Sequence, residues 1–267
     1  MITDDEFHRL VSFIKCKAGI DLTAKRILCE TRLESYVATS KYNSVGEYLN
    51  QALANGNGDS TESLINILTT NHTFFWREEQ HFMFFMNKVL PELKQRYGDI
   101  KDLRIWCAAS STGEEPYTIA MCLMDYFGIQ HAMWDTVVLA TDISTKVLRI
   151  ADKGIYPSDS IRNMPAQWQK TFFVKENDTV RVIPKLREQV IFRRLNLIEN
   201  FPFRKKLHVV FCRNVLIYFD ENMKADIVNR IADALEPGGY LFIGTTESIS
   251  RTTDKMEYVA PSVYRRK

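Results

Sequence analysis

The sequence lacks the features that mark secreted, membrane-spanning and metal-stapled proteins. Its five cysteines are scattered and never form a C-x-x-C pair, which argues against a disulfide framework and a zinc site and fits a reducing cytosol. The first residues contain no basic region followed by an apolar one, so we expect no signal peptide. The longest apolar clusters, such as residues 82–85, are much shorter than a membrane span. We therefore expect a cytoplasmic protein without direct membrane insertion.

Two further absences narrow the function. The net charge is only +2, whereas a nucleic-acid-binding protein usually carries a strong basic stripe, so we expect no nucleic-acid partner. The glycine fingerprint G-x-G-x-x-G, which binds the pyrophosphate of dinucleotides, is also missing, and this counts against NAD or FAD as a cofactor.

The first part of the chain, residues 1–80, has the periodicity of helices. Thr3 and Glu6 form a capping box that opens the first helix, and Gly19 ends it. A second helix is expected from about residue 24 to residue 39. Its core face is expected to consist of Ile27, Leu28, Leu33 and Val37.

The rest of the chain changes character. Residues 81–98 are expected to form a linker helix that Pro91 kinks or splits. From residue 99 to residue 267, strand-like runs alternate with helical ones, which predicts a parallel sheet covered on both faces. The runs 172–174, 180–183 and 190–193 are expected to form antiparallel strands of a small β insertion near residues 170–194. The predicted fold class is α/β, preceded by an all-α N-terminal domain.

The loop after the first predicted strand is the first place to look for a ligand, because open α/β sheets bind ligands beyond the carboxyl ends of their strands. Residues 108–117 read AASSTGEEPY, and the small residues let a ligand approach the backbone closely. Glu114 and Glu115 would repel a phosphate but suit a cationic ligand such as S-adenosylmethionine, which carries a sulfonium and an ammonium group. The alternative is that both acids only cap the following helix.

Asp142 ends the second predicted strand. A carboxylate at this position can accept hydrogen bonds from ribose hydroxyl groups, although helix capping is an equally open interpretation. The combination of Gly113 and Asp142 across one β-α-β unit favours a ligand site.

Four segments together resemble the CheR family of chemotaxis receptor methyltransferases. They are TNHTFFWRE at 70–78, the run from 106 to 117, RLNL at 194–197 and FCRNVLIYF at 211–219. The resemblance extends over nearly the whole chain. It implies a Rossmann-like domain that uses S-adenosylmethionine without a metal. The implied activity is that of a protein-glutamate O-methyltransferase, which forms glutamate methyl esters on chemotaxis receptors for sensory adaptation.

The resemblance also implies the residues of the site. Arg77 and Tyr218 are expected beside the methyl group that is transferred. The implied cofactor pocket consists of Asn71, Thr73, Arg77, Glu115, Asp142, Asn196, Leu197, Arg213 and Asn214. His72, between two pocket residues, is interpreted as structural, and Glu247 as a rim residue. Trp76 departs from the family, which more often has Phe at this position.

These residues suit methyl transfer to a carboxylate. A glutamate side chain has a reference pKa of about 4.3, so it is ionised near neutral pH and needs no general base. Arg77 would position this carboxylate through charge-assisted hydrogen bonds, and the Tyr218 hydroxyl group would help to orient it. The alternative for Arg77 is an ion pair with Glu78 or Glu79 on a helix face.

A basic cluster in the first part of the chain suggests how the partner binds. Lys25, Arg26 and Arg32 lie on the second predicted helix, with Lys15 and Lys17 before it. The resemblance implies that residues 1–80 dock on the acidic, helical, cytoplasmic region of the receptor, although a solvated face is the alternative. The short turn at residues 175–179 argues against binding of a receptor C-terminal tether. Nothing in the sequence demands an oligomer, so we expect a monomer.

Two other functions stay open from the sequence. A methyltransferase could act on another protein, a small molecule or a nucleic acid, but residues 214–217 lack the [DN]-P-P-[YFW] motif of enzymes that methylate bases. A non-catalytic module could sense S-adenosylmethionine, but such a module would need neither Arg77 nor Tyr218.

Overall fold

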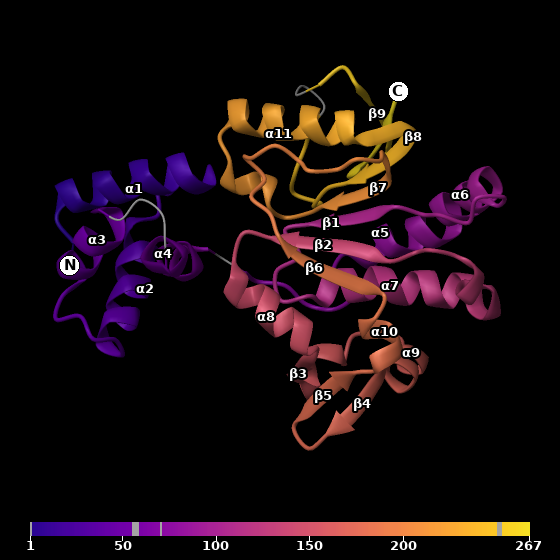
Figure 1. The fold of residues 1–267 in the computed structure, drawn as a ribbon, viewed down its shortest axis with the longest axis horizontal. Helices are drawn as coiled ribbons and strands as arrows, with labels where there is room; N and C mark the ends of the chain where they lie inside the picture. Colours follow the sequence, from indigo (N-terminus) through magenta and orange to yellow (C-terminus); the bar gives the residue numbers. More distant parts are fainter. Residues whose placement is uncertain (1, 55–58, 70, 250–252) are drawn as a thin grey trace.

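The computed structural model describes residues 2–54, 59–69, 71–249 and 253–267. A helical N-terminal domain lies at one end of a larger α/β domain (Figure 1). The helices of the N-terminal domain are α1 (Asp4–Ala18), α2 (Arg26–Ala38), α3 (Val45–Ala54) and α4 (Asp59–Leu68). Their inward faces form a separate hydrophobic core that includes Leu10, Leu33 and Leu49.

The ends of α1 follow the predicted signals. The backbone N–H of Glu6 donates to Thr3 Oγ1 over 3.2 Å, and the backbone N–H of Thr3 donates to Glu6 Oε2 over 2.8 Å. These bonds satisfy two donors that a helix start leaves free. At the other end Gly19 has a left-handed φ of 72°, a conformation that glycine adopts without a steric penalty.

The predicted core face of α2 is wrong in part. Ile27 is 80% exposed and Leu28 is 36% exposed, whereas Cys29 and Leu33 are buried. Successive helical residues are 100° apart, so a face centred on Cys29 and Leu33 turns Ile27 to the opposite side. Two large apolar side chains therefore remain on the outside of this helix.

The linker is split near Pro91, as predicted. It consists of α5 (Glu79–Phe84), a π-helical segment (Phe85–Val89) and α6 (Leu90–Tyr97). In the π-helical segment the Leu90 N–H donates to the Phe85 carbonyl group, five residues back. A wider turn of this kind adapts the backbone next to proline, which has no N–H and crowds the preceding turn.

In the described residues, seven strands form the main sheet in the order β6-β2-β1-β7-β8-β10-β9. The strands β6, β2, β1, β7 and β8 are parallel to one another, and the antiparallel strands β10 and β9 complete the edge beside β8. Their bounds are β1 (Ile105–Ala108), β2 (Val138–Asp142), β6 (Val190–Arg194), β7 (Leu207–Cys212), β8 (Leu235–Phe242), β9 (Met256–Ala260) and β10 (Val263–Arg266).

Helices cover both faces of this sheet (Figure 1). Ile105 and Cys107 of β1 point into the core that contains α7 (Glu114–Phe127), while Trp106 and Ala108 point into the core that contains α11 (Glu221–Ala234). This alternation is the period of two that a strand imposes. The helix α8 (Thr145–Lys153) follows β2, and short 3₁₀ segments span Gly128–Met133, Ser158–Ile161 and Leu216–Tyr218.

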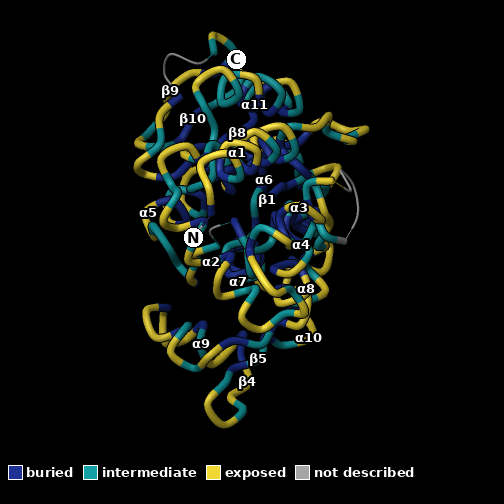
Figure 2. The backbone as a smooth tube through the Cα atoms, turned by 90° about the vertical axis from the view of Figure 1, so that its left-hand side faces the viewer, coloured by how far each residue is buried: buried dark blue, intermediate teal, exposed yellow. Residues whose placement is uncertain are grey.

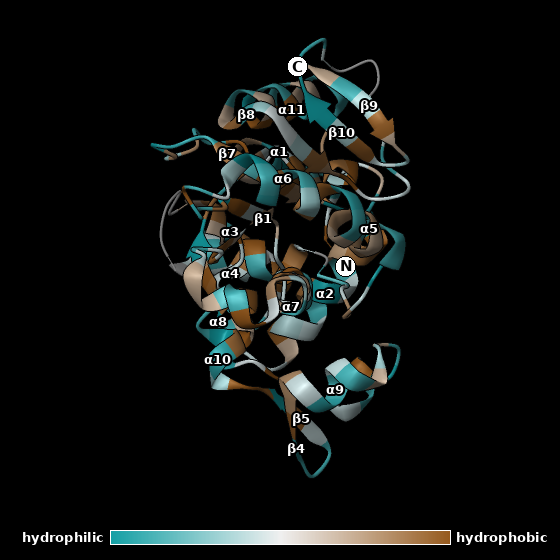
Figure 3. Ribbon diagram, turned by 90° about the vertical axis from the view of Figure 1, so that its right-hand side faces the viewer, coloured by the Kyte–Doolittle hydropathy of each residue, from teal (hydrophilic) through white to brown (hydrophobic). Residues whose placement is uncertain are grey.

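The predicted make-up of the β insertion is wrong for one strand. The small antiparallel sheet has the order β3-β5-β4, with β3 (Ile155–Pro157), β4 (Phe173–Glu176) and β5 (Thr179–Val182), and α9 (Ala166–Phe172) beside it. The run predicted at 190–193 is instead β6, which pairs in parallel with β2 after α10 (Pro184–Arg187). Periodicity alone does not determine which strand pairs with which. The insertion projects from the domain and its β4–β5 turn is an exposed tip (Figure 2, Figure 3).

None of the helices in the described part of the chain is long and apolar enough to cross a membrane.

Buried His208 makes the free energy of unfolding depend on pH. Its Nδ1 atom accepts the backbone N–H of Arg104 over 3.0 Å, and burial, together with the Arg104 charge, lowers its pKa to about 4. Burial likewise lowers the pKa of His81 to about 4. Both folded pKa values lie below the unfolded value near 6.5. The stability that the two neutral histidines contribute is therefore fully present above pH 6.5 and is lost as the pH falls towards 4.

We expect the free energy of unfolding to fall between pH 7 and pH 4, by an amount on the order of 3 kcal/mol per histidine. His208→Gln should lower the stability at pH 7 but flatten the pH dependence, because one titrating ring is gone. Denaturant unfolding at several pH values measures both effects. An unchanged slope in the variant would show that His208 does not titrate in this range.

Candidate functional site

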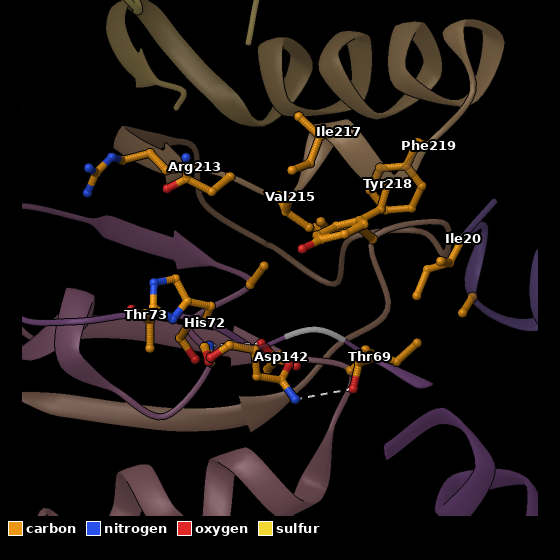
Figure 4. Close-up of a pocket in the computed structure, with 18 of the residues that line it drawn as sticks. Ile20, Thr69, His72, Thr73, Asp142, Arg213, Val215, Ile217, Tyr218 and Phe219 are labelled. Atoms are coloured by element: carbon orange, nitrogen blue, oxygen red, sulfur yellow. Dashed lines mark hydrogen bonds between the residues drawn. The ribbon is translucent and has the colours of Figure 1, made fainter. Parts of the chain in front are cut away.

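A cavity lies beyond the carboxyl ends of the central strands, between the sheet and the N-terminal domain (Figure 4). In the described residues the chain order reverses between β1 and β7, and such a switch point is where open α/β sheets bind ligands. All of the predicted site residues line this one cavity: Asn71, Thr73, Arg77, Glu115, Asp142, Asn196, Leu197, Arg213, Asn214 and Tyr218. Their individual roles in binding stay predictions.

The loop after β1 forms the floor of the cavity. Ala109, Ser111 and Gly113 all have positive φ angles, so the chain turns sharply and presents its backbone to the cavity. The hydroxyl oxygen of Ser110 is buried, lines the cavity and has no hydrogen-bond partner within the protein. A buried polar atom without a partner is costly, so this atom fits a site that is completed by a polar ligand.

Asp142 is tied to this loop. Its Oδ2 atom accepts the backbone N–H of Ser111 over 2.8 Å, and its Oδ1 atom accepts the backbone N–H of Ser144 over 2.9 Å. Burial raises the pKa of this carboxyl group, and the backbone N–H groups offset part of that effect. The carboxylate therefore has a fixed orientation at the end of β2, and each oxygen keeps a further lone pair for ligand hydroxyl groups.

The two adjacent acids of α7 have different surroundings. Glu115 lines the cavity and forms an ion pair with Arg213 over 2.6 Å. Glu114 is buried on another side of the helix, where it accepts the Thr112 hydroxyl over 2.6 Å, and burial raises its pKa. Neighbouring helical residues point about 100° apart, which explains why only one of the two acids reaches the cavity.

Arg213 supports the site through buried contacts of its guanidinium group. Its side chain is fully buried, and Figure 4 shows it extending away from Tyr218. Besides Glu115, its guanidinium group reaches the Glu78 carboxylate over 3.1 Å and the Arg77 carbonyl oxygen over 2.6 Å. Its guanidinium group thus joins α7, β7 and the start of the linker, and it orients Glu115 towards the cavity.

Two carboxylates that the sequence analysis did not place in the site hold Asn214. Glu78 accepts the Asn214 side-chain amide over 3.1 Å, and Glu247 accepts the Asn214 backbone N–H over 2.9 Å. Asn214 has a left-handed φ of 57°. The Glu247 carboxylate also accepts the N–H groups of Gly244 and Ile217 over 2.6 and 3.3 Å, so it holds the loop that carries Asn214.

Gly244 makes this arrangement possible. A side chain at this position would place its Cβ 2.4 Å from Asn214 Nδ2 and 2.9 Å from the Asn214 backbone nitrogen. These contacts are much shorter than van der Waals separations, so only glycine allows the two loops to approach this closely.

The two predicted catalytic residues lie on different segments. Arg77 donates to the His72 carbonyl oxygen over 3.0 Å, and its Nε atom lies 4.0 Å from Glu78 Oε1. The ion pair with Glu78, the alternative role of Arg77, is therefore a long one, because Glu78 mainly binds Arg213 and Asn214. The carbonyl group of His72 has a structural role, while its side chain is exposed and lines the cavity.

The N-terminal domain also reaches the cavity. Ile20, Leu22 and Lys25 are among its lining residues, and the Lys25 ammonium lies 4.6 Å from the centre of the Tyr218 ring. Buried Asn196 donates its side-chain amide to the Lys17 carbonyl oxygen over 2.8 Å. These contacts had no signal in the sequence, because their partners lie far apart in the chain.

The lining fits S-adenosylmethionine. It contains two acids, an uncommitted buried hydroxyl group and apolar side chains such as Leu197, which match an ammonium group, ribose hydroxyl groups and an adenine ring. Within the described ranges, no group of three or more His, Cys, Asp or Glu side chains could hold a metal ion.

Comparisons with known proteins agree with this site. Residues 5–69 match the model of the CheR methyltransferase all-alpha domain, and residues 71–264 match that of the CheR methyltransferase SAM binding domain. A chemotaxis protein methyltransferase of Borreliella burgdorferi is 39% identical, covering 99% of this chain and 95% of that protein. Chemotaxis protein methyltransferases of Vibrio cholerae and Escherichia coli are 34% and 35% identical, covering 97% and 98% of this chain and 94% and 91% of those proteins.

Family models that span most of the chain and full-length relatives of this identity support the resemblance over the two other functions that the sequence left open. The chain therefore belongs to the CheR family of chemotaxis protein methyltransferases, S-adenosylmethionine-dependent enzymes that methylate chemoreceptors on glutamate side chains.

Proposed function

We propose that the cavity binds S-adenosylmethionine through Asp142, Glu115 and the loop after β1, and that Arg77 and Tyr218 present the receptor glutamate to it. The observation that carries this proposal is that all of these groups line one cavity at the switch point of the sheet. Asp142 and Ser110 would meet hydroxyl or amino groups of the cofactor, and Glu115 would meet a positively charged or N–H-bearing part.

The chemistry requires orientation rather than proton removal. When bound, the cofactor supplies a methyl group on a sulfonium, which is electrophilic enough for direct displacement by a carboxylate oxygen. The glutamate is already ionised near neutral pH, so no residue has to act as a base. Holding the reacting groups in line and excluding water supplies the catalytic effect.

Arg77 and Tyr218 suit this task in different ways. The Arg77 guanidinium group is partly engaged by the His72 carbonyl oxygen, which fixes its direction and leaves further N–H donors for a carboxylate. Tyr218 offers a hydroxyl group and a ring wall. Such a pair can hold a carboxylate without binding it so tightly that its nucleophilicity is lost.

We further propose that the N-terminal domain docks on the receptor beside the cavity. The predicted basic cluster supports this only through Lys25, because Arg26 pairs with Asp4 and Glu30, and Arg32 donates to the carbonyl oxygens of Leu68 and Thr69. The outer face of α2 instead presents Ile27, 80% exposed, next to Leu28 of the cavity lining. An exposed apolar side chain, Ile27, close to a cation at the cavity, Lys25, would suit an amphipathic, acidic receptor helix.

The same site supports the remaining expectations. Both walls of the cavity come from one chain, so we propose that the enzyme works as a monomer, in the cytoplasm, on the cytoplasmic region of its receptors. The β4–β5 connection consists of only Asn177 and Asp178, so we do not propose tether binding.

The two adjacent glutamates of α7 test cofactor binding with a matched control. Glu115→Gln should weaken binding of S-adenosylhomocysteine by about 1.5–3 kcal/mol, the range for hydrogen bonds to charged groups. Glu114→Gln changes the same charge outside the cavity and should leave the affinity almost unchanged. Calorimetry measures the affinity of both variants for S-adenosylhomocysteine. Equal losses of affinity in the two variants would show that Glu115 does not contact the cofactor.

The roles of Arg77 and Tyr218 are tested by single-turnover methylation of a receptor fragment at saturating cofactor and receptor. Arg77→Ala should slow transfer on the order of a hundredfold, because the carboxylate loses its orientation. Tyr218→Phe keeps the ring and should cost about 0.5–1.5 kcal/mol, the contribution of one hydrogen bond. A wild-type rate that rises tenfold per pH unit from 6 to 7, and loses this rise in His72→Ala, would contradict a mechanism without a base.

Docking is tested with two exposed isoleucines, one in each domain. Ile27→Asp should raise the KM for the receptor about fivefold to tenfold, the effect of losing an apolar interface contact, without changing cofactor affinity. Ile129→Asp is the control, since Ile129 is 98% exposed on the 3₁₀ segment Gly128–Met133, at the far end of α7 from the cavity. If both variants keep the wild-type KM, the outer face of α2 does not contact the receptor.

A further inference from the structure

We infer that the segment between α1 and α2 of the N-terminal domain, residues 19–25, positions Tyr218 for methyl transfer. The N-terminal domain is then a part of the active site as well as a docking module. This inference rests on the proposed role of Tyr218 and extends it to residues outside the cofactor-binding domain.

The segment touches Tyr218 directly at two points. The backbone N–H of Asp21 donates to the Tyr218 carbonyl oxygen over 2.9 Å. The Lys25 ammonium lies over the Tyr218 ring, 4.6 Å from its centre. One contact therefore fixes the backbone of Tyr218, and the other fixes the plane of the ring that carries the hydroxyl group.

The neighbours of Tyr218 are held by the same part of the N-terminal domain. Gly19 packs against the Phe219 ring: a Cβ atom on Gly19 would lie 3.0 Å from Phe219 Cε1 and 2.5 Å from Ile198 Cγ2. Lys15, in the last turn of α1, forms an ion pair with Asp220 over 2.9 Å. Consecutive residues 218, 219 and 220 thus all contact one stretch of the N-terminal domain.

The segment is rigid enough to act as a support. Asp21 Oδ1 accepts both the backbone N–H and the hydroxyl group of Thr23, over 2.9 and 2.6 Å. The backbone N–H of Lys25 donates to the Leu22 carbonyl oxygen over 2.8 Å, and the Leu22 side chain is buried. These bonds close a compact turn whose position is fixed by the core of the N-terminal domain.

Tyr218, by contrast, lies in a short 3₁₀ segment, Leu216–Tyr218. On the side towards β7, Glu247 holds this loop through the N–H groups of Asn214 and Ile217. On the other side the supports described above come from the N-terminal domain. A short 3₁₀ turn has weak internal hydrogen bonds, so the position of the Tyr218 hydroxyl group depends on both supports.

A methyl group at position 19 tests the inference. The added methyl group of Gly19→Ala would meet both Ile198 and the Phe219 ring, so the segment shifts relative to the Tyr218 loop. Methyl transfer at saturating cofactor and receptor should then slow about tenfold, since small misplacements of reacting groups cost much rate. The affinity for S-adenosylhomocysteine should change less than roughly threefold. The matched control is Gly154→Ala, another left-handed helix end, with φ 61°, where an added Cβ meets nothing closer than 3.3 Å. It carries the same backbone strain and should transfer at the wild-type rate.

A double variant separates this inference from the proposed role of Tyr218. If Gly19→Ala acts through the Tyr218 hydroxyl group, its effect should be much smaller in a Tyr218→Phe background, because one group cannot be lost twice. Full additivity of the two effects would overturn the inference while leaving the role of Tyr218 intact. If Tyr218→Phe alone transfers at the wild-type rate, the proposed role of Tyr218 fails instead.

Lys25 provides a second test that does not disturb the helix end. Lys25→Met removes the cation over the ring and keeps the apolar stem, so at saturating receptor, where weaker docking no longer limits the rate, it should slow transfer severalfold. Lys25→Arg should restore most of this rate because it keeps the cation–π contact. These two variants test whether the segment positions Tyr218 even if Gly19→Ala does not fold. Wild-type rates in both Gly19→Ala and Lys25→Met would show that the segment does not position Tyr218.

Discussion

The buried guanidinium group of Arg213 joins the parts of the molecule from which the site is built. It lies 5.2 Å from the centre of the Phe82 ring, with the carboxylates of Glu115 and Glu78 on its polar edge. A charge removed from water is stabilised by the carboxylates that pair with it, and loss of one partner of such a group typically costs about 3–5 kcal/mol. The mutual orientation of α7, the end of β7 and the linker is therefore fixed by an electrostatic requirement, and the cavity is the space that these elements enclose.

Around this group, side chains of the site are oriented by hydrogen bonds and ion pairs to neighbouring groups. Glu115 and Asp142, which line the cavity, each have their direction set by a neighbour, Arg213 in one case and the backbone N–H of Ser111 in the other. Glu78 and Glu247 do the same for Asn214. Orientation is the main contribution that a methyl transfer to an ionised carboxylate asks of a protein, and pre-set side chains supply it without reorganisation during the reaction.

Much of the fold could be predicted because its signals are local. The capping box of Thr3 and Glu6, the split at Pro91 and the strand before the AASSTGEEPY loop depend only on nearby residues. The errors come from relations between distant segments. Val190–Arg194 has the pattern of a strand, but only the sheet shows that its partner is β2. Ile27 and Leu28 are apolar at helical spacing, but the phase of the buried face is set by the packing of α2 on α4. For the site, the motifs indicated which residues gather, whereas the supports of Tyr218 from residues 19–25 have no trace in local sequence.

The close approach of Gly244 to Asn214 has a consequence for how this enzyme can diverge. Residue 244 has no room for a side chain while residue 214 keeps its amide and residue 247 its carboxylate. A side chain at position 244 would press on both Asn214 and Glu247, and loss of the Glu247 carboxylate would leave the backbone N–H groups of residues 214, 217 and 244 without this acceptor. The close packing therefore predicts that position 244 stays glycine in lineages that keep asparagine at position 214 and glutamate at position 247.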